Sequence, residues 1–396
     1  MIPRVLQAKL LGLARKFPVV TVTGPRQSGK TTLCRATFPK KAYVSLEAPD
    51  VRTYAVEDPR GFLAQYRHGA VLDEVQRVPQ LLSYLQAEVD ARPGKGRFVL
   101  TGSANFALLE SVSQSLSGRT ALLNLLPLSL DEIRLFPQRS DDLLAVLWRG
   151  SYPAVFDRRL APQDWYASYV GTYLERDVRL ILSIGDLAAF QTFLRLCAGR
   201  TANLLNLSAL GADCGVTHNT AKSWISVLEA SFVAYRLAPF HSTVSKRLVK
   251  TPKLHFYDSG LVCYLLGIRN PGQLRDHPLR GAIFETWVAS EILKARVHRG
   301  LPPGLTCFRD RKGMEVDLIL EQDSDRVAVE TKSGQTVARD FFSNLETFGR
   351  RLCTGRSGGR LRQVVVYGGN EKQQRSNALV LPWSMVDRFD WAGKRS

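Results

Sequence analysis

The sequence predicts an α/β protein whose N-terminal half is built on a parallel β-sheet. One observation is a strand, loop and helix succession, PVVTVTGPRQSGKTTL, over residues 18–33. The other is a series of apolar runs that alternate with helix-compatible segments, the pattern of a parallel sheet covered by helices. The further strand candidates span 42–49, 69–76, 97–105 and 120–128. Because such sheets bind ligands beyond the carboxyl ends of their strands, polar residues at those ends are the site candidates.

The loop after the first strand has the pattern GxxxxGK[ST], with a strand before it and a helix after it. Its two glycines let backbone N–H groups face a phosphate, and the helix N-terminus adds partial positive charge. Lys30 is expected to reach the β- and γ-phosphates of a nucleotide, and the Thr31 hydroxyl to ligate Mg²⁺. The expected nucleotide-binding residues are Gly24, Pro25, Arg26, Gln27, Ser28, Gly29, Lys30, Thr31 and Thr32.

Acidic and polar residues follow two of the later strands. The run GAVLDEVQ ends in Asp73 and Glu74. Asp73 suits the outer ligand sphere of Mg²⁺, and Glu74 suits the base that polarises the attacking water. After the strand RFVLT, Ser103 or Asn105 is placed to sense a γ-phosphate, with a simple strand-to-turn cap as the alternative.

Arg119 follows the strand that would carry the phosphate sensor. An arginine there can act in trans on the γ-phosphate held by a neighbouring subunit, which predicts a homo-oligomer. A solvated surface arginine is the alternative, because the chain contains 54 lysines and arginines.

The motifs of this half resemble, in order and spacing, those of prokaryotic AAA-type ATPases whose AAA domain is fused to a C-terminal domain of unknown function 4143. The matching segments are GPRQSGKTTL, YVSLEAPD, AVLDEVQ, FVLTGSAN and SGR, followed by GSYPAV (150–155), YLERDV (173–178) and KTPKLHFYDSGL (250–261). The resemblance covers most of the chain. It implies a P-loop NTPase sheet of the AAA/ASCE type, ATP binding and ATP hydrolysis.

The middle of the chain has the rhythm of a helix-turn-helix over residues 206–232. A first helix ends at Gly215, Thr217 caps the second, and apolar residues then recur at helical spacing. A winged helix is the expected fold, with nucleic acid as its partner; a protein-docking module or rigid connector is the alternative. The expected contact residues are Thr217, His218, Asn219, Lys222 and Ser223, with Lys246, Arg247, Lys250 and Lys253 from a wing.

The last part of the chain contains a helix with Glu285, a strand with Asp317 and a strand end with Glu330 and Lys332. This order of residue types is that of restriction-endonuclease-like phosphodiesterases, and the same core resembles that of the family's C-terminal domain. The three carboxylates would hold Mg²⁺ and Lys332 would orient the nucleophile. The alternatives are a domain that binds nucleic acid or protein without cutting, and a plain surface ion pair.

Composition adds general expectations to these motifs. The formal net charge of +18 favours a polyanion such as nucleic acid as partner. No apolar run approaches the ~20 residues of a membrane span, and the N-terminus lacks a signal-peptide cleavage pattern. The six cysteines lack metal-binding spacing. Free thiols in a reducing cytoplasm are therefore expected.

These observations predict three domains, with boundaries at Pro- and Gly-containing segments. They are a P-loop ATPase domain at 1–160, a helical and winged-helix domain at 161–270 and a nuclease-like α/β domain at 271–396. The expected function is Mg²⁺-dependent ATP hydrolysis that acts on, or is regulated by, nucleic acid. The alternatives are an ATP-dependent nuclease, and an ATP-driven switch that docks a protein partner.

Overall fold

The computed structural model describes residues 2–102, 114–174, 186–240, 250–322, 325–353 and 359–393. The chain divides into two compact units. The first contains Met1–Leu128, Ala230–Phe232 and Val297–Leu301, and the second contains Ser129–Glu229, Val233–Arg296 and Pro302–Ser396. Within the described part of the chain, no helix is both long enough and apolar enough to cross a membrane.

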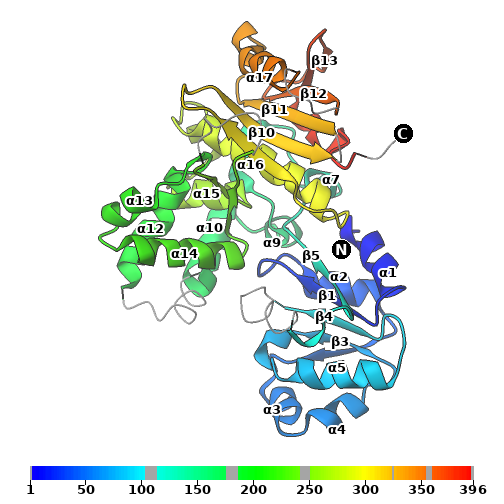
Figure 1. Ribbon diagram of the computed structural model, residues 1–396. Helices are drawn as coiled ribbons and strands as arrows, with labels where there is room; N and C mark the ends of the chain where they lie inside the picture. The colour runs from blue at the N-terminus through cyan, green and yellow to red at the C-terminus, as the bar shows by residue number, and fades with distance from the viewer. Residues whose placement is uncertain are drawn as a thin grey trace. The chain divides into compact units, whose positions relative to one another are not determined.

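A parallel sheet of five strands forms the centre of the first unit, in the order β2-β3-β4-β1-β5 (Figure 1). The strands are β1 (Val19–Thr23), β2 (Ala42–Ser45), β3 (Ala70–Asp73), β4 (Phe98–Thr101) and β5 (Thr120–Asn124). The predicted parallel sheet is confirmed. Because β4 lies between β1 and β3, the carboxyl ends of these three strands meet at one edge of the sheet.

Helices cover both faces of this sheet. They are α1 (Leu6–Ala14), α2 (Lys30–Thr37), α3 (Pro49–Glu57), α4 (Pro59–Ala64), the short η1 (Val75–Arg77) and α5 (Leu81–Ala91). Alternate strand residues enter separate cores: Leu72 packs with residues of α3, α4 and α5, whereas Val71 packs with residues of α1 and α2. The inner strands are largely apolar on both faces because both faces are buried.

The second unit begins with a group of short helices. These are α7 (Leu130–Ile133), α8 (Leu143–Arg149), α9 (Pro153–Asp157), α10 (Pro162–Tyr169), the π-helical turn η2 (Val170–Leu174) and α15 (Ser259–Leu265). A buried carboxylate joins several of them: Asp258 accepts hydrogen bonds from Ser151 Oγ at 2.8 Å and from Tyr166 OH at 2.5 Å. Gly150 and Gly260 border this network, and a Cβ on either would lie 2.0 or 2.3 Å from the Tyr166 hydroxyl.

The second unit also contains three further helices and a small antiparallel sheet of order β6-β8-β7. The helices are α12 (Leu187–Gly199), α13 (Leu207–Asp213) and α14 (His218–Ala230); the strands are β6 (Asn203–Leu204), β7 (Ala234–Leu237) and β8 (Lys253–Phe256). Gly215 has a φ of 71° between α13 and α14, and Thr217 Oγ1 accepts from Thr220 N at 3.1 Å. The predicted glycine turn and threonine cap are therefore confirmed.

A mixed sheet of six strands, in the order β13-β14-β12-β11-β10-β9, forms the C-terminal part of the second unit. The strands are β9 (Leu305–Arg309), β10 (Glu315–Gln322), β11 (Asp325–Lys332), β12 (Leu361–Tyr367), β13 (Gln373–Gln374) and β14 (Leu379–Pro382). Two helices, α16 (Arg280–Val297) and α17 (Ser343–Cys353), lie on its two sides (Figure 1). The short helical segments η3 (Pro271–Leu274), η4 (Arg339–Phe342) and η5 (Trp383–Arg388) complete this part.

Candidate functional site

The P-loop between β1 and α2 requires glycine at two positions. Gly24 has a φ of 145°, and a Cβ there would lie 2.2 Å from the carbonyl oxygen of Leu125. Gly29 caps α2 with a φ of 93°, in the left-handed region that favours glycine. Gln27 also adopts a positive φ of 61°. The loop therefore turns sharply into the N-terminus of α2, where backbone N–H groups can receive a phosphate.

Lys30 lies within this loop and is only 6% exposed. Its Nζ donates to the carbonyl oxygens of Gly24 at 3.1 Å and Pro25 at 2.7 Å. Burial lowers the pKa of Lys30 to about 8, although the carboxylates of Glu74 and Asp73 act in the opposite direction. Nearby, the buried hydroxyl of Ser28 has no hydrogen-bond partner among the described residues. A buried ammonium and an unsatisfied hydroxyl fit a loop that receives phosphate oxygens.

The other predicted loop residues differ in exposure. Pro25 is buried, Arg26 is half-buried, and Gln27 and Thr32 are exposed. Arg26 nevertheless takes part in further interactions within the structure. Their roles in nucleotide binding stay predictions.

Asp73 ends β3 and its carboxylate collects three hydroxyl donors. Thr31 Oγ1 donates to Oδ2 at 2.9 Å, and Tyr43 OH donates to the same oxygen at 2.7 Å. Thr101, at the end of β4, donates to Oδ1. The three donors come from α2, β2 and β4 and hold the carboxylate beside the P-loop. Asp73 and Thr31 thereby form the oxygen pair expected to meet Mg²⁺.

Glu74 follows Asp73 in a left-handed conformation with a φ of 59°. Its Oε2 accepts a hydrogen bond from Gln76 Nε2 at 2.5 Å. Burial raises the pKa of Glu74, Lys30 counteracts this effect, and Asp73 adds to it. A carboxylate whose pKa is raised toward neutrality is better suited to accept a proton from water. The residues present therefore fit a nucleotide with a divalent cation at the carboxyl edge of the sheet.

Arg119 lies away from this site. It immediately precedes β5, and its carbonyl oxygen accepts from the amide of Val19 at 3.2 Å, at the amino end of the sheet. Its guanidinium pairs with Asp90 through contacts of 2.6 and 2.8 Å. Because the P-loop lies at the opposite ends of the strands, Arg119 does not reach the nucleotide site of its own chain, and a role in trans stays a prediction. Ser103 and Asn105 lie outside the described residues.

The second helix of the helix-turn-helix presents a polar face to solvent. Trp224, Ile225 and Leu228 are buried in the core of this part, as their spacing predicts. Five residues at the start of α14 are exposed: Thr217, His218, Asn219, Lys222 and Ser223. Of the basic residues expected on a wing, Lys250 is exposed, and Lys246 and Arg247 lie outside the described residues.

The expectation that Lys253 contacts phosphate from a wing is wrong. Lys253 is 1% exposed, and its Nζ lies 2.7 Å from Glu285 Oε1 and 3.9 Å from Asp317 Oδ1. It also contacts the carboxylate of Glu315. Burial alone would lower the pKa of Lys253, but the three carboxylates outweigh it and raise the pKa. The physical reason is strand alternation, which turns Lys253 toward the acidic residues of α16 and β10 and away from solvent.

The predicted C-terminal carboxylates have different ion-pair partners. Glu285 and Asp317 converge on Lys253, whereas Glu330 pairs with Lys332 at 2.8 Å. Asp317 Oδ2 also accepts hydrogen bonds from the Thr331 amide at 2.7 Å and hydroxyl at 2.8 Å. In the described ranges, no three His, Cys, Asp or Glu side chains are arranged to hold a metal ion. These residues, as placed, do not fit the expected Mg²⁺.

Burial nevertheless perturbs these carboxyl groups. Burial, reinforced by Asp317, raises the pKa of both Glu285 and Glu330. Glu330 Oε2 is buried without a hydrogen-bond partner among the described residues. Burial lowers the pKa of Lys332, but the adjacent carboxylate of Glu330 raises it by more. The surface-ion-pair alternative therefore does not describe Glu330, whose side chain is only 4% exposed.

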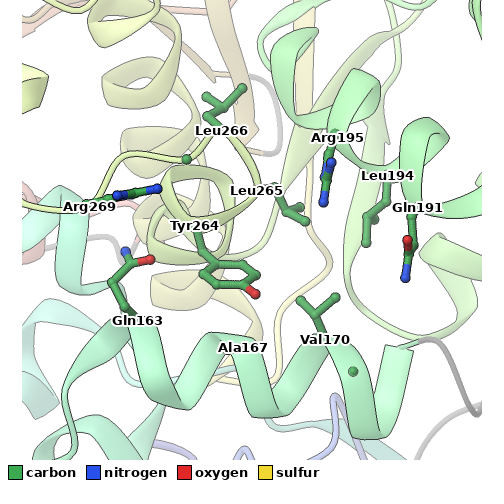
Figure 2. Close-up of a pocket in the computed structure, with 12 residues that line it drawn as sticks. Gln163, Ala167, Val170, Gln191, Leu194, Arg195, Tyr264, Leu265, Leu266 and Arg269 are labelled. Carbon is green, nitrogen blue, oxygen red and sulfur yellow. The ribbon is translucent and has the colours of Figure 1, made fainter. Parts of the chain in front are cut away.

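A cavity of about 640 Å³ opens elsewhere in the second unit (Figure 2). Figure 2 shows Gln163, Ala167 and Val170 along one side, with Tyr264 and Leu265 facing them. Its lining contains two arginines, Arg195 and Arg269, but none of the residues that the sequence singles out.

Several residues of the two sites escape sequence reasoning. Tyr43 and Thr101 bind Asp73 from neighbouring strands, and Glu315 binds Lys253 from β10. The one available signal is position, because Thr101 and Asp73 both end strands of the same sheet. A pattern within one strand does not show which strand lies beside it.

Comparison with known proteins agrees with this architecture. The AAA domain family matches residues 16–134, and two domains of unknown function, DUF8612 and DUF4143, match residues 140–272 and 280–386. Uncharacterized proteins of Mycobacterium bovis and Mycobacterium tuberculosis are each 29% identical over 379 residues, which cover 94% of this chain and 81% of the relative.

Solved structures provide more distant comparisons. The Walker-type ATPase PABY2304 of Pyrococcus abyssi is 13% identical, with a TM-score of 0.45, over 66% of this chain and 94% of that one. AMPPCP-bound DnaA from Aquifex aeolicus is 14% identical, with a TM-score of 0.30, over 57% of this chain and 86% of that one. On the family matches, the chain contains an AAA domain and a C-terminal DUF4143 domain, the fusion that its sequence motifs resemble.

Proposed function

We propose that this protein is a Mg²⁺-dependent ATPase that acts on, or is regulated by, nucleic acid. The observation that carries the proposal is the hydrogen bond from Thr31 to Asp73 beside the buried ammonium of Lys30. It places the end of β3 beside the P-loop and the start of α2. An AAA domain over the same residues supports nucleotide binding independently.

Each residue of this edge has a distinct role in the proposal. The P-loop amides and Lys30 bind the β- and γ-phosphates, and Thr31 and Asp73 hold the hydrated cation between them. Mg²⁺, when bound with ATP, neutralises charge on the phosphates. Glu74 accepts a proton from the attacking water, and the raised pKa that burial gives it suits this transfer.

The nucleic-acid part of the proposal rests on the helix-turn-helix. The order of helices and strands from α12 to β8, with the sheet order β6-β8-β7, supports the expected winged helix. The helix α14 begins with exposed polar and basic side chains, which can donate to phosphates or base edges. The formal net charge of +18 favours encounter with a polyanion. A cytoplasmic location stays a prediction.

ATP hydrolysis measured with and without double-stranded DNA tests both parts. We expect hydrolysis that requires Mg²⁺, that is lost in Lys30→Ala, and that rises when DNA is added. Hydrolysis that DNA does not change, together with no salt-sensitive DNA affinity, would favour the alternative of a switch that docks a protein partner. A purified protein that turns over no ATP under either condition would overturn the ATPase assignment.

A further inference from the structure

The buried side chain of Lys253 sits among three carboxylates of the second unit. We call Lys253, Glu285, Glu315 and Asp317 the Lys253 cluster. Its members come from β8, α16 and β10, so segments distant in sequence meet in it. Lys253 Nζ lies 2.7 Å from Glu285 Oε1, contacts Glu315 and lies 3.9 Å from Asp317 Oδ1. Glu285 and Asp317 are 12% and 13% exposed, so a neighbouring cation stabilises their charged forms.

The ammonium of Lys253 supplies the positive charge beside these carboxylates. An ammonium group has three donors and no acceptor, so it can satisfy several carboxylates at once. A divalent ion bound by the same oxygens would lie about 2.0–2.6 Å from each of them. The Nζ of Lys253 already occupies the space between Glu285 and Glu315. A metal ion and this ammonium therefore exclude one another, by volume and by charge.

A second observation points into the same cluster. His255, two residues along β8, is fully buried, and its Nε2 has no hydrogen-bond partner among the described residues. That nitrogen lies 3.9 Å from Glu285 Oε1, while Nδ1 meets Thr286 Oγ1 at 3.2 Å. An imidazole nitrogen beside carboxylate oxygens is a donor set for Mn²⁺ or Zn²⁺. The cluster thus has the ligand types of a metal centre, with a lysine at its middle.

We propose that the ammonium of Lys253 is a built-in cation that takes the place of a divalent metal ion in this cluster. The wild-type cluster then holds no metal and cuts no phosphodiester bond, and it serves instead to tie β8 to the six-stranded sheet. Removal of the ammonium leaves three carboxylates and one imidazole, and so creates a site for Mn²⁺. The inference concerns a site separate from the P-loop and does not depend on ATP hydrolysis.

Mn²⁺ binding to the full chain, measured by calorimetry and electron paramagnetic resonance, tests this proposal. Lys253→Ala and Lys253→Gln remove the charge, and the glutamine keeps hydrogen-bond donors in case alanine impairs folding. Lys250→Ala is the matched control, because it removes an exposed lysine three residues away. All proteins keep the wild-type P-loop and contain no nucleotide, so Mn²⁺ held near Thr31 contributes equally to each.

We expect the wild type and Lys250→Ala to bind the same number of Mn²⁺ ions, and the Lys253 variants to bind one more per chain. Adding Asp317→Asn to Lys253→Ala should remove that extra ion. Wild-type Mn²⁺ binding or Mn²⁺-dependent plasmid cleavage that disappears in Asp317→Asn would overturn the proposal. So would Lys253 variants that gain no ion, or that fail to fold even with Mn²⁺ present, since the metal is expected to restore the missing charge.

Discussion

The hydroxyl of Thr31 donates a hydrogen bond of 2.9 Å to the carboxylate of Asp73, joining the first turn of α2 to the end of β3. Asp73 is 5% exposed and depends on donors from neighbouring elements to keep its charge at this position. Thr101 supplies one from inside the sheet, and Tyr43 supplies one from the sheet edge. The orientation of the carboxylate is thus set before any nucleotide arrives.

Loss of the Thr101 hydroxyl should weaken the fold around Asp73 more than loss of the Tyr43 hydroxyl. Thr101→Val leaves one buried carboxylate oxygen unsatisfied and should cost about 2 kcal/mol of local stability. Tyr43→Phe should cost about 1 kcal/mol or less, because Tyr43 is 37% exposed and water can replace it. Hydrogen exchange of the β3 and β4 amides measures both. Equal effects of the two changes would contradict this ranking.

ATP affinity should fall as the pH rises above 8. Burial lowers the pKa of Lys30 from 10.5 to about 8. In the folded protein the Lys30 ammonium therefore loses its proton as the pH rises through about 8. Phosphates bind the ammonium, and affinity should therefore decline toward about tenfold per pH unit above the pKa. Titrations with ATP between pH 7 and 9.5 measure the decline. Lys30→Met should bind weakly, with no inflection near pH 8; an inflection that persists in it would assign the proton to another group.

Arg119 should act on the nucleotide of a neighbouring subunit. Its position at the amino end of the sheet keeps it from the P-loop of its own chain. The Arg119→Ala protein keeps the P-loop and the base Glu74 but lacks the arginine that would act in trans. The Glu74→Gln protein keeps this arginine but lacks the base. An equal mixture of these two inactive proteins should therefore regain ATP hydrolysis, up to about a quarter of the wild-type turnover per subunit, because half of the subunits keep Glu74 and half of these meet a neighbour with Arg119.

The control for this mixture is a protein that carries both substitutions. Mixing it with Arg119→Ala supplies no Arg119 and should restore no ATP hydrolysis. Asp90→Asn breaks the ion pair but keeps the guanidinium, so it should preserve turnover. If the first mixture gives no more than the sum of its components, Arg119 is a surface arginine.

Lys222 should contribute to DNA affinity through a phosphate. It is exposed on the first turns of α14, where a recognition helix meets the nucleic-acid backbone. Lys222→Ala should weaken binding to all sequences alike and reduce the slope of log affinity against log salt by about 1. Fluorescence anisotropy at several salt concentrations measures the slope. Lys40→Ala removes an exposed lysine of the first unit and should leave the slope unchanged.

The sequence predicts the parts of this molecule whose chemistry is local. Gly24, Lys30 and Thr31 lie within eight consecutive positions, and a strand and a helix on either side fix their geometry. The same holds for Thr217, which caps the helix that follows it. The apolar run of residues 70–72 likewise marks Asp73 as the end of a buried strand.

Contacts between distant segments are not predictable in this way. Lys253 looks like a wing residue because lysines surround it in sequence, yet it is buried against α16 and β10. Its environment depends on which face of β8 meets the six-stranded sheet, and that packing is a property of the whole second unit. The donors to Asp73 pose the same difficulty, since Tyr43 becomes its neighbour only when β2 pairs with β3.

The most direct measurement of the ATPase assignment is single-turnover hydrolysis by Glu74→Gln, with ATP binding measured on the same protein. Glutamine keeps the size of Glu74 but accepts no proton from water. ATP should therefore bind with wild-type affinity, while the hydrolysis rate falls by about 10²–10⁴-fold. Turnover at the wild-type rate would contradict the assignment of Glu74 as the base.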